Sequence, residues 1–463
     1  GFSIPGRETR LNNILTVRPI RHNGGLYDSI YNGISDSYDI DTLDNSLSFL
    51  FRMNTTPSVR ATTLSRTSEE RGPDMSVRTW LPLIALVCCV FLLNFSEFAP
   101  IGLLTDISKD FGISESTTGL IISVYAWAVA ILSLPLMLLL RRMQYRPMLL
   151  MCIALFVVFQ VITGLSNSYG MLMVSRLGVA VSHSIFWSIA TPLAVAVVPM
   201  EYKKLAISAV AAGTSIAMIV GLPLGRIIGL ALGWRMTFVF IAVIAMIALV
   251  FLIAVFPKVE NPGTFTLRKL PTILKNPVLI GIYTTLILLV TGYYTGYSYI
   301  EPFLGTTAGL SETMITIVLT VFGLAGIVGS AAFTKLYDVV GFRFVIISLC
   351  GVLVCLLALL PSAEFALVLM IICAAWGFFV TVFNTAFQNE ALKALPSDGS
   401  AVGMGLYSGL FNVGIAMGSI IGGVVTDSIS IDAIGLVGAV FVACALVIAS
   451  RYLAARVAAN TAG

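Results

Sequence analysis

Five ionisable side chains lie within stretches of sequence that are otherwise apolar: Glu97, Arg176, His183, Arg226 and Glu301. A charge inside a membrane span is costly, so residues of this kind usually face other protein groups and mark ion or proton pathways. Carboxylates and imidazoles bind and release protons, and a nearby guanidinium favours the ionised form of a carboxylate. This set of side chains therefore indicates proton transfer inside an apolar environment.

The depths of these residues follow from the spacing along their apolar runs. With a rise of about 1.5 Å per residue, Glu97 and Arg176 lie roughly 10 Å below the outer ends of their runs. Arg226 lies at a similar depth, and Glu301 is closer to the outer interface. Two acids and two bases in one layer can neutralise one another, which burial otherwise makes costly. His183 lies two helical turns beyond Arg176, on about the same face and nearer the midplane.

We interpret Glu97 and His183 as proton-coupling candidates, and Arg176, Arg226 and Glu301 as their charge partners. Each residue also has a structural interpretation. Arg176 can lock helices together, and Arg226 can be a counter-ion after the GLPLGR turn. Glu301 can be an interfacial residue before a helix-bending proline, and His183 can be hydrogen-bonded within a helix interface. Glu97 has no basic neighbour in its own run, which favours a carboxylate that exchanges protons.

Amide and aromatic side chains form a second group that could bind a substrate. The candidates for a substrate cavity are Tyr125, Trp127, Trp187, Tyr297, Trp376, Asn384, Gln388 and Asn412. Amides can bind hydroxyl groups, or they can bridge helices inside the membrane. Aromatic faces suit a sugar or a flat drug, and they also form belts at the membrane interface. These residues therefore leave sugars and drugs open as substrates.

The elements that must position these residues are membrane-spanning helices. Hydrophobic residues make up 58% of the chain and charged residues 11%, against about 25% charged residues in soluble domains. The apolar residues form runs of roughly 18–25 residues, long enough to cross the bilayer as helices. We predict an all-α membrane protein with twelve transmembrane helices in two six-helix halves, over residues 80–104, 118–140, 147–166, 169–198, 206–232, 236–256, 278–303, 314–333, 344–361, 365–388, 402–425 and 434–452.

The distribution of positive charge predicts the orientation of the spans. Alternate loops are rich in Lys and Arg, whereas the opposite loops hold only Lys109 and Arg235 among basic residues. Basic loops remain in the cytoplasm, so we expect both termini to be cytoplasmic. The seven cysteines lie inside apolar runs without the spacing of metal ligands, and we interpret them as packing residues.

Composition also predicts the domain organisation. Residues 1–74 are polar and have no sustained hydrophobic period, so we interpret them as a disordered or non-native extension, or alternatively as a regulatory tail. We expect a six-helix bundle over 75–256, a cytoplasmic linker over 257–277, a second bundle over 278–456 and a tail over 457–463. The halves echo one another: RRMQYRP follows the second span and YDVVGFR the eighth, and SEFAP and YIEPF each place a glutamate near the end of a first span. Repeated halves are typical of secondary transporters, whose substrate site lies at the midplane.

Glycines in two corresponding spans predict close helix approach. The fifth span contains GTSIAMIVGLPLG and the eleventh contains GMGLYSGLFNVGIAMGSIIGG. Small residues of this kind let helix backbones meet within the membrane. Pro223 removes one backbone hydrogen bond, so we expect a bend in the fifth span.

Several of these segments resemble the major facilitator superfamily, in its drug and sugar efflux branch, over about residues 76–456. They are NFSEFAPIGLL with GLIISVYAWAVAILSLPLMLL, SRLGVAVSHSIFWSI, VGLPLGRIIG with GWRMTF, and SGLFNVGIAMGSIIGG. The resemblance is strongest to bacterial sugar efflux transporters, which export arabinose-like sugars and thiogalactosides. It assigns Arg142, Arg146, Asp338, Gly341 and Arg343 to gating loops. The loop after the second span departs from the family pattern, since a basic residue and Gln144 replace the usual acid and glycine, and Leu222 departs from the usual fifth-span motif.

The resemblance implies a transporter of the bacterial inner membrane that exports a small molecule by alternating-access antiport against protons. It implies no cofactor, a proton gradient as the energy source, and a monomer in the lipid bilayer with no nucleic-acid partner. No G-x-x-x-x-G-K-[ST] phosphate loop is present in the sequence. The alternatives are a multidrug antiporter or an uptake symporter on the same fold, and a lipid-modifying membrane enzyme. An enzyme would need a catalytic constellation near one interface, and the sequence has no metal cluster or nucleophile–base pair of that kind.

Overall fold

The computed structural model describes residues 77–140, 142–259, 270–396 and 400–461. The chain divides into two units, Gly1–Gly72 and Pro73–Gly463, and everything described belongs to the second. The predicted extension over residues 1–74 therefore lies outside the described residues. All regular elements in the described ranges are helices, which confirms the predicted all-α class.

The first half of the fold contains six spans. The first and the fifth span are each divided into three pieces, because each contains a short non-α segment. The elements in chain order are α2 (Val77–Phe98), η1 (Ala99–Leu103), α3 (Leu104–Phe111), α4 (Glu115–Leu140), α5 (Tyr145–Gly164), α6 (Tyr169–Ala196), η2 (Met200–Tyr202), α7 (Lys203–Ile216), the π-helical η3 (Ala217–Gly221), α8 (Leu222–Leu232) and α9 (Trp234–Val255).

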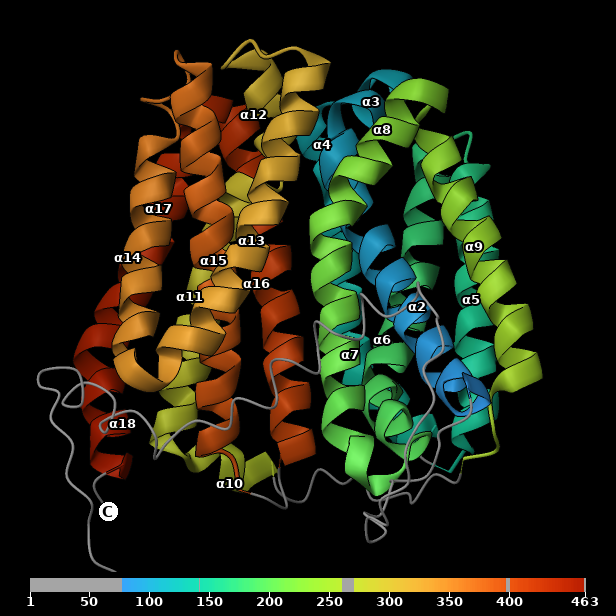
Figure 1. Cartoon of the computed structure of the whole chain (residues 1–463). Coiled ribbons are helices and arrows are strands. Elements are labelled where there is room, and N and C mark those ends of the chain that lie inside the picture. Colours follow the sequence, from blue (N-terminus) through green and yellow to red (C-terminus); the bar gives the residue numbers. More distant parts are fainter. Residues whose placement is uncertain (1–76, 141, 260–269, 397–399, 462–463) are drawn as a thin grey trace, which may run out of the picture. The chain divides into compact units, whose positions relative to one another are not determined.

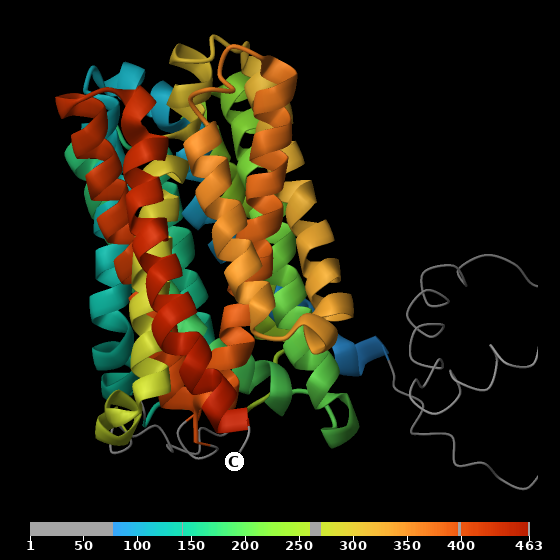
Figure 2. The same cartoon turned by 90° about the vertical axis from the view of Figure 1, so that its left-hand side faces the viewer.

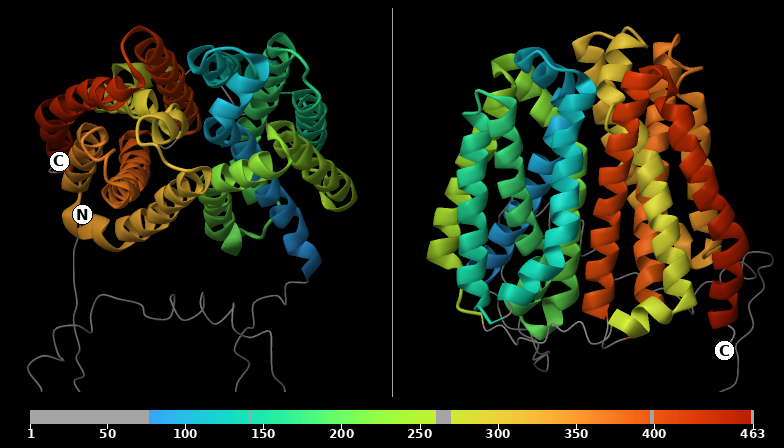
Figure 3. Two further views of the ribbon diagram at one scale, coloured as in Figure 1. Left: turned by 90° about the horizontal axis from the view of Figure 1, so that it is seen from above. Right: turned by 180° about the vertical axis from the view of Figure 1, so that it is seen from behind.

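The second half repeats this plan and begins with a short helix in the linker. The elements are α10 (Leu270–Lys275), α11 (Pro277–Tyr297), α12 (Ile300–Thr306), α13 (Glu312–Val340), α14 (Arg343–Ala358), α15 (Ala366–Ala394), α16 (Ser400–Ser428), η5 (Ile431–Ala433), α17 (Ile434–Ile448), η6 (Ala449–Leu453) and α18 (Ala454–Thr461). Figure 1 shows the two six-helix halves side by side, and Figure 3 shows them from above.

The helices match the predicted spans in number and order. Among the described residues, 11 helical segments are long and apolar enough to cross a membrane, and the shorter apolar helix Arg343–Ala358 occupies the remaining position. Several helices continue past the predicted ends of their spans. For example, α13 reaches Val340 and α15 reaches Ala394, because polar residues that leave the hydrocarbon core can remain helical.

Proline and glycine shape the interrupted first and fifth spans. Pro100 is the second residue of the 3₁₀ segment η1, three residues after Glu97. The π-helical η3 ends two residues before Pro223, so the distortion expected at this proline is a local widening of the helix. Phe95 packs against this region, and a Cβ placed on Gly221 or Gly225 would lie 3.2 Å from its ring. The predicted close approach of the fifth span is therefore confirmed, and it is made to the first span.

The eleventh span makes the corresponding approach in the second half. Gly414, Gly418 and Gly422 of α16 lie against α11, where Cβ atoms would collide with Val290 and with backbone carbonyl oxygens. The two halves contact each other mainly through α4 with α16, and through α13 with η3 and α8. Figure 2 shows α16 and α11 in the same half, beside the teal helices of the first half.

Candidate functional site

Glu97 lies in the last turn of α2, beside the cavity between the halves. Its side chain is 13% exposed, and its Oε2 is 3.7 Å from Nε2 of His183 on α6. That separation is longer than an N–H···O hydrogen bond, so the contact is electrostatic in this conformation. The sequence predicted both residues as proton-coupling candidates, and the structure brings them together.

His183 is held from its other nitrogen by Tyr125 of α4. The Tyr125 hydroxyl and His183 Nδ1 are 2.6 Å apart, and both side chains are buried. The imidazole also lies edge-on to the Tyr125 ring and beside Trp187. The sequence placed Tyr125 and Trp187 in the substrate cavity, and the structure adds that both contact His183.

Arg176 is fully buried in α6, two helical turns before His183. Its Nη1 donates to the backbone oxygen and hydroxyl of Ser96, at 3.1 and 3.2 Å, and Gln160 also donates to that hydroxyl. Its guanidinium carbon lies 4.6 Å from the centre of the Tyr125 ring, a cation–π contact. Within the described part of the chain, Nε and Nη2 have no hydrogen-bond partner, and no direct ion pair joins Arg176 to Glu97.

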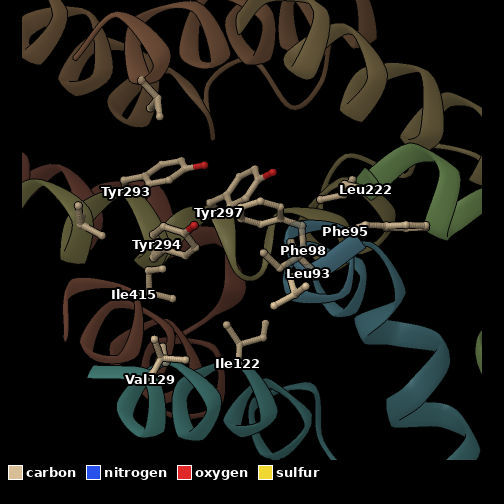
Figure 4. Close-up of a cluster of buried hydrophobic side chains, with 14 of the residues drawn as sticks. Leu93, Phe95, Phe98, Ile122, Val129, Leu222, Tyr293, Tyr294, Tyr297 and Ile415 are labelled. Atoms are coloured by element: carbon tan, nitrogen blue, oxygen red, sulfur yellow. The ribbon is translucent and has the colours of Figure 1, made fainter. Parts of the chain in front are cut away.

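A cavity of about 10 Å³ lies beside Glu97. This volume is close to that of a single water probe, so the space beside Glu97 has room for about one water molecule in this conformation. Its lining comes from both halves and comprises Glu97, Phe98, Ile101, Ile122, Tyr125, Tyr294 and Ile415. Figure 4 shows Phe98 and Ile122 of the first half facing Tyr294 and Ile415 of the second.

An aromatic cluster adjoins the cavity in the second half. Tyr297 stacks between Tyr293 and Phe322, with ring centres 4.9 and 5.0 Å apart, and Trp376 meets these three rings edge-on. The Trp376 indole N–H is buried without a hydrogen-bond partner in the described structure. The predicted cavity residues Tyr297 and Trp376 thus contact each other behind Tyr294.

The predicted amides occupy the inner part of the second half. Asn412 is buried one helical turn before the cavity residue Ile415, and its amide nitrogen donates to the Ser408 carbonyl. The side-chain oxygens of Asn412 and Asn384 are buried without partners among the described residues. Gln388 is exposed, one turn beyond Asn384. Trp127, also predicted to line the cavity, is partly buried and packs against the core.

Arg226 forms a second charged cluster, separate from Glu97, at the outer end of the bundle as the predicted topology defines it. Its Nη1 donates to the Gly102 carbonyl at 2.7 Å and lies 3.1 Å from Glu301 Oε1. Its Nη2 forms an ion pair with Glu312 of α13. Because Arg226 belongs to the first half and both glutamates to the second, this cluster joins the halves.

Glu301 completes this outer cluster through Thr105 of α3. Its Oε2 accepts from the Thr105 backbone N–H at 3.1 Å and from the hydroxyl at 2.8 Å. The depth argument placed Glu301 near the interface and all four span charges in one mutually neutralising layer. The structure corrects the second part of this picture: the charges form two clusters, because depth along an axis does not determine which face of a helix a residue occupies.

A second contact between the halves lies on the opposite side of the outer end. The Tyr299 ring, at the start of α12, reaches across to Gly119 of α4, and a Cβ on Gly119 would collide with its hydroxyl. The same hydroxyl donates to the Ser419 carbonyl at 3.2 Å. Gly423 of α16 lies beside Ser116, and a Cβ there would be 3.4 Å from Ser116 Cβ.

The predicted gating loops lie at the inner end. Gly341 ends α13 with a φ of 60°, a backbone conformation that other residues rarely adopt, so the turn requires glycine. Arg146 donates to the Ile253 carbonyl at 2.8 Å within the first half. Arg142, Asp338 and Arg343 are exposed.

Three polar contacts were missed by the sequence interpretation. Glu312 lies just before the predicted eighth span and was not singled out, because it begins its helix and its partner Arg226 belongs to the fifth span. Nothing in the sequence pattern indicated a role for Thr105. Buried Glu390 accepts from Tyr337 and from Lys393 Nζ, the latter at 3.0 Å. The i, i+3 spacing of Glu390 and Lys393 could have indicated this last pair.

Comparison with known proteins identifies the fold. A family model described as Major Facilitator Superfamily matches residues 86–409 and 302–462. Two similar solved structures are of a bacterial homolog to the human lysosomal transporter Spinster, both inward-facing. The unoccupied form has a TM-score of 0.64 at 14% identity and covers 81% of this chain and 97% of that chain. The occupied form has a TM-score of 0.61 at 15% identity, with 81% and 96% covered.

Proposed function

Because the chain belongs to the Major Facilitator Superfamily, we propose that it is a proton-coupled antiporter that exports small molecules by alternating access. The family and the twelve-helix fold indicate a secondary transporter rather than an enzyme, with a small-molecule substrate and a lipid bilayer around it. The observation that supports proton coupling is the position of Glu97. Because both halves line the cavity beside this carboxylate, its surroundings change whenever the halves move.

The proposed cycle uses Glu97 as the site that the proton and the substrate visit in turn. When the outer ends separate, the substrate leaves to the outside and the carboxylate takes a proton from there, where protons are more abundant. When the inner ends separate, the proton leaves to the cytoplasm and a substrate molecule binds. Arg176 and His183 lie close enough to influence the charge of Glu97. The proton gradient supplies the energy, and the cycle needs no cofactor and no second subunit in the inner membrane.

Sugars of the arabinose or thiogalactoside type are the proposed substrates. Their hydroxyl groups suit the unpartnered amide oxygens of Asn384 and Asn412, and their faces suit the rings around Trp376. A different observation favours hydrophobic drugs: apart from Glu97 and two tyrosines, the cavity lining is apolar. Multidrug efflux is therefore the second candidate. Uptake of labelled sugar and of a lipophilic dye into inverted vesicles distinguishes the two.

Replacement of Glu97 tests the coupling. In Glu97→Gln, the side chain keeps its shape but cannot carry a proton, so transport driven by a pH gradient should collapse. Substrate exchange across the membrane without a gradient should continue, because exchange does not require the site to reload a proton. Glu97→Asp should retain partial activity. Transport by Glu97→Gln at the wild-type rate under a pH gradient would refute Glu97 as the coupling residue, and substrate accumulation on the proton-rich side of the membrane would support export.

A further inference from the structure

The hydrogen bond between Tyr125 and His183 has no part in the cycle described above, although it lies directly beside Glu97. The Tyr125 hydroxyl and His183 Nδ1 are 2.6 Å apart, and the opposite ring nitrogen, Nε2, faces Glu97 at 3.7 Å. The three side chains come from α4, α6 and α2, so their alignment depends on the packing of three helices. Tyr125 and His183 are both buried, which excludes bulk water as an alternative partner.

A neutral imidazole carries one proton, so one nitrogen donates and the other accepts. If the Tyr125 hydroxyl donates to Nδ1, the ring proton must be on Nε2, where the N–H points at the Glu97 carboxylate. A hydrogen bond to one nitrogen of a histidine commonly fixes the tautomer in this way. The 3.7 Å separation closes to a hydrogen bond with a small movement of either side chain.

The other charged and titratable groups around Glu97 are few. Arg176 of α6 is the cation of the cluster, and it lies over the Tyr125 ring. Tyr294 of α11 lines the same cavity, whereas α16 contributes only Ile415 there, and α5 contributes the uncharged Gln160 through Ser96. A second cation on His183 would be repelled by Arg176, which favours the neutral imidazole that the tautomer argument requires.

We propose that Tyr125 is a positioning residue for proton coupling: its hydroxyl holds His183 with the proton on Nε2, and this N–H stabilises the ionised carboxylate of Glu97. This inference rests on the proposed role of Glu97. Tyr125 thereby sets the pH at which Glu97 takes up its proton, without itself gaining or losing one.

The test is an infrared titration of the Glu97 carboxyl band in the purified full-length protein, with the band assigned by its absence in Glu97→Gln. In Tyr125→Phe, the tautomer of His183 is no longer fixed, so the Nε2–H no longer stabilises the ionised carboxylate of Glu97. The protonated band should therefore persist to higher pH, with its midpoint raised by about one pH unit, which corresponds to about 1.4 kcal/mol. The pH profile of transport should move in the same direction.

Two further variants separate positioning from a general loss of structure. In His183→Gln, the amide presents an N–H to Glu97 whatever Tyr125 does, so adding Tyr125→Phe should cause no further shift. Tyr283→Phe is the matched control, because Tyr283 donates a single hydrogen bond, at 3.1 Å to the Gly403 carbonyl, near the inner end of α11. It should leave the midpoint unchanged.

An unchanged midpoint in Tyr125→Phe would overturn the inference, and so would a shift to lower pH, which is the result expected if Nδ1 were the donor. A shift of equal size in the His183→Gln background would also overturn it. These outcomes are distinct from failure of the proposed function. The band reports protonation directly, whether or not transport depends on it, and the function fails only if Glu97→Gln still transports under a pH gradient.

Discussion

Arg176 illustrates how a buried charge is accommodated without a carboxylate in contact. Its guanidinium is satisfied in part by two oxygens of Ser96 and by the Tyr125 ring, and two of its nitrogens have no partner in the described structure. Hydrogen bonds to a charged group contribute more than those between neutral groups. Arg176 therefore acts chiefly by holding α2 against α6, and its effect on Glu97 is exerted through space.

This arrangement predicts how the two residues respond to substitution. Glu97→Gln should unfold thermally close to wild type, because no direct ion pair is broken. Arg176→Gln should lose roughly 1–3 kcal/mol of stability, because the oxygens of Ser96 lose their charged donor. The double variant should be no more stable than Arg176→Gln. Rescue of a destabilised Glu97→Gln by Arg176→Gln would instead show that the two form a charge pair.

The sequence singled out the residues of the candidate site, but it did not predict their contacts. Apolar surroundings were enough to single out Glu97, His183, Arg176, Arg226 and Glu301, because a charge in a span is rare. Depth could be calculated from the helical rise, but rotation about each helix axis could not. For that reason the pairing of Glu301 with Arg226 and the hydrogen bond from the Tyr125 hydroxyl became visible only in three dimensions.

At the scale of helices, the outer end is closed by two separate contacts between the halves. One is ionic and joins Arg226 of α8 to Glu301 and Glu312 of the second half. The other is a steric fit of Tyr299 against Gly119. Short non-α segments occur beside the ionic contact: η1 precedes Thr105, and η3 precedes α8. Such segments are frequent at functional hinges, and hydropathy could not reveal them, because the residues are as apolar as their neighbours.

The ionic contact should respond unequally to loss of its two acids. Glu301 is 4% exposed and Glu312 is 61% exposed, and an exposed ion pair contributes only about 0–1 kcal/mol. Glu301→Gln should therefore shift the protein toward an outward-open state much more than Glu312→Gln. The measurement is labelling of a single cysteine at Ile101, in a cysteine-free background, by a membrane-impermeant reagent added outside.

The control for this prediction is Asp110→Asn. Asp110 pairs with Arg235 at 2.7 Å within the first half, so the pair does not join the halves. Loss of this pair should leave the labelling rate unchanged. Equal labelling of Glu301→Gln and Asp110→Asn would contradict a role for Glu301 in outer closure.

A cysteine pair can test the steric contact. In Ser116→Cys/Gly423→Cys, the two Cβ atoms would lie about as close as the roughly 3.5–4.5 Å found in disulfides. Oxidation should lock the outer end and stop net transport, and reduction should restore it. The native cysteines are replaced first, and each single variant is assayed alone, since Gly423→Cys must displace the Tyr299 hydroxyl. Full transport after complete cross-linking would mean that this contact does not open during the cycle.

At the scale of the whole molecule, the lengths of the apolar runs were enough to predict the twelve-helix fold. A helix that crosses a bilayer must be long and apolar, so composition and spacing located the spans before any coordinates were known. The ends of α13 and α15 were predicted too short, because Lys335, Asp338 and Lys393 lie in helical turns beyond the hydrocarbon core. The packing of the halves against each other could not be derived from a single sequence.

The orientation in the membrane remains a prediction, and two exposed positions test it. A cysteine at Thr272 in α10 should be inaccessible to an impermeant reagent in intact cells, since the basic linker is expected in the cytoplasm. A cysteine at Glu364, between α14 and α15, should react. Both sites should react in permeabilised cells. External labelling of position 272 but not of 364 would reverse the proposed orientation.

The contact that closes the outer end also affects the proton gradient across the host membrane. The buried cluster of Arg226 and Glu301 meets the first span at Gly102 and Thr105, roughly 10 Å outward of Glu97 along that span. While it is intact, we expect it to keep external protons from Glu97, the proposed coupling carboxylate. A variant in which this closure is weakened would let protons cross the membrane without export of a substrate molecule. Such a variant should depolarise its host membrane and slow growth, even where no substrate is present.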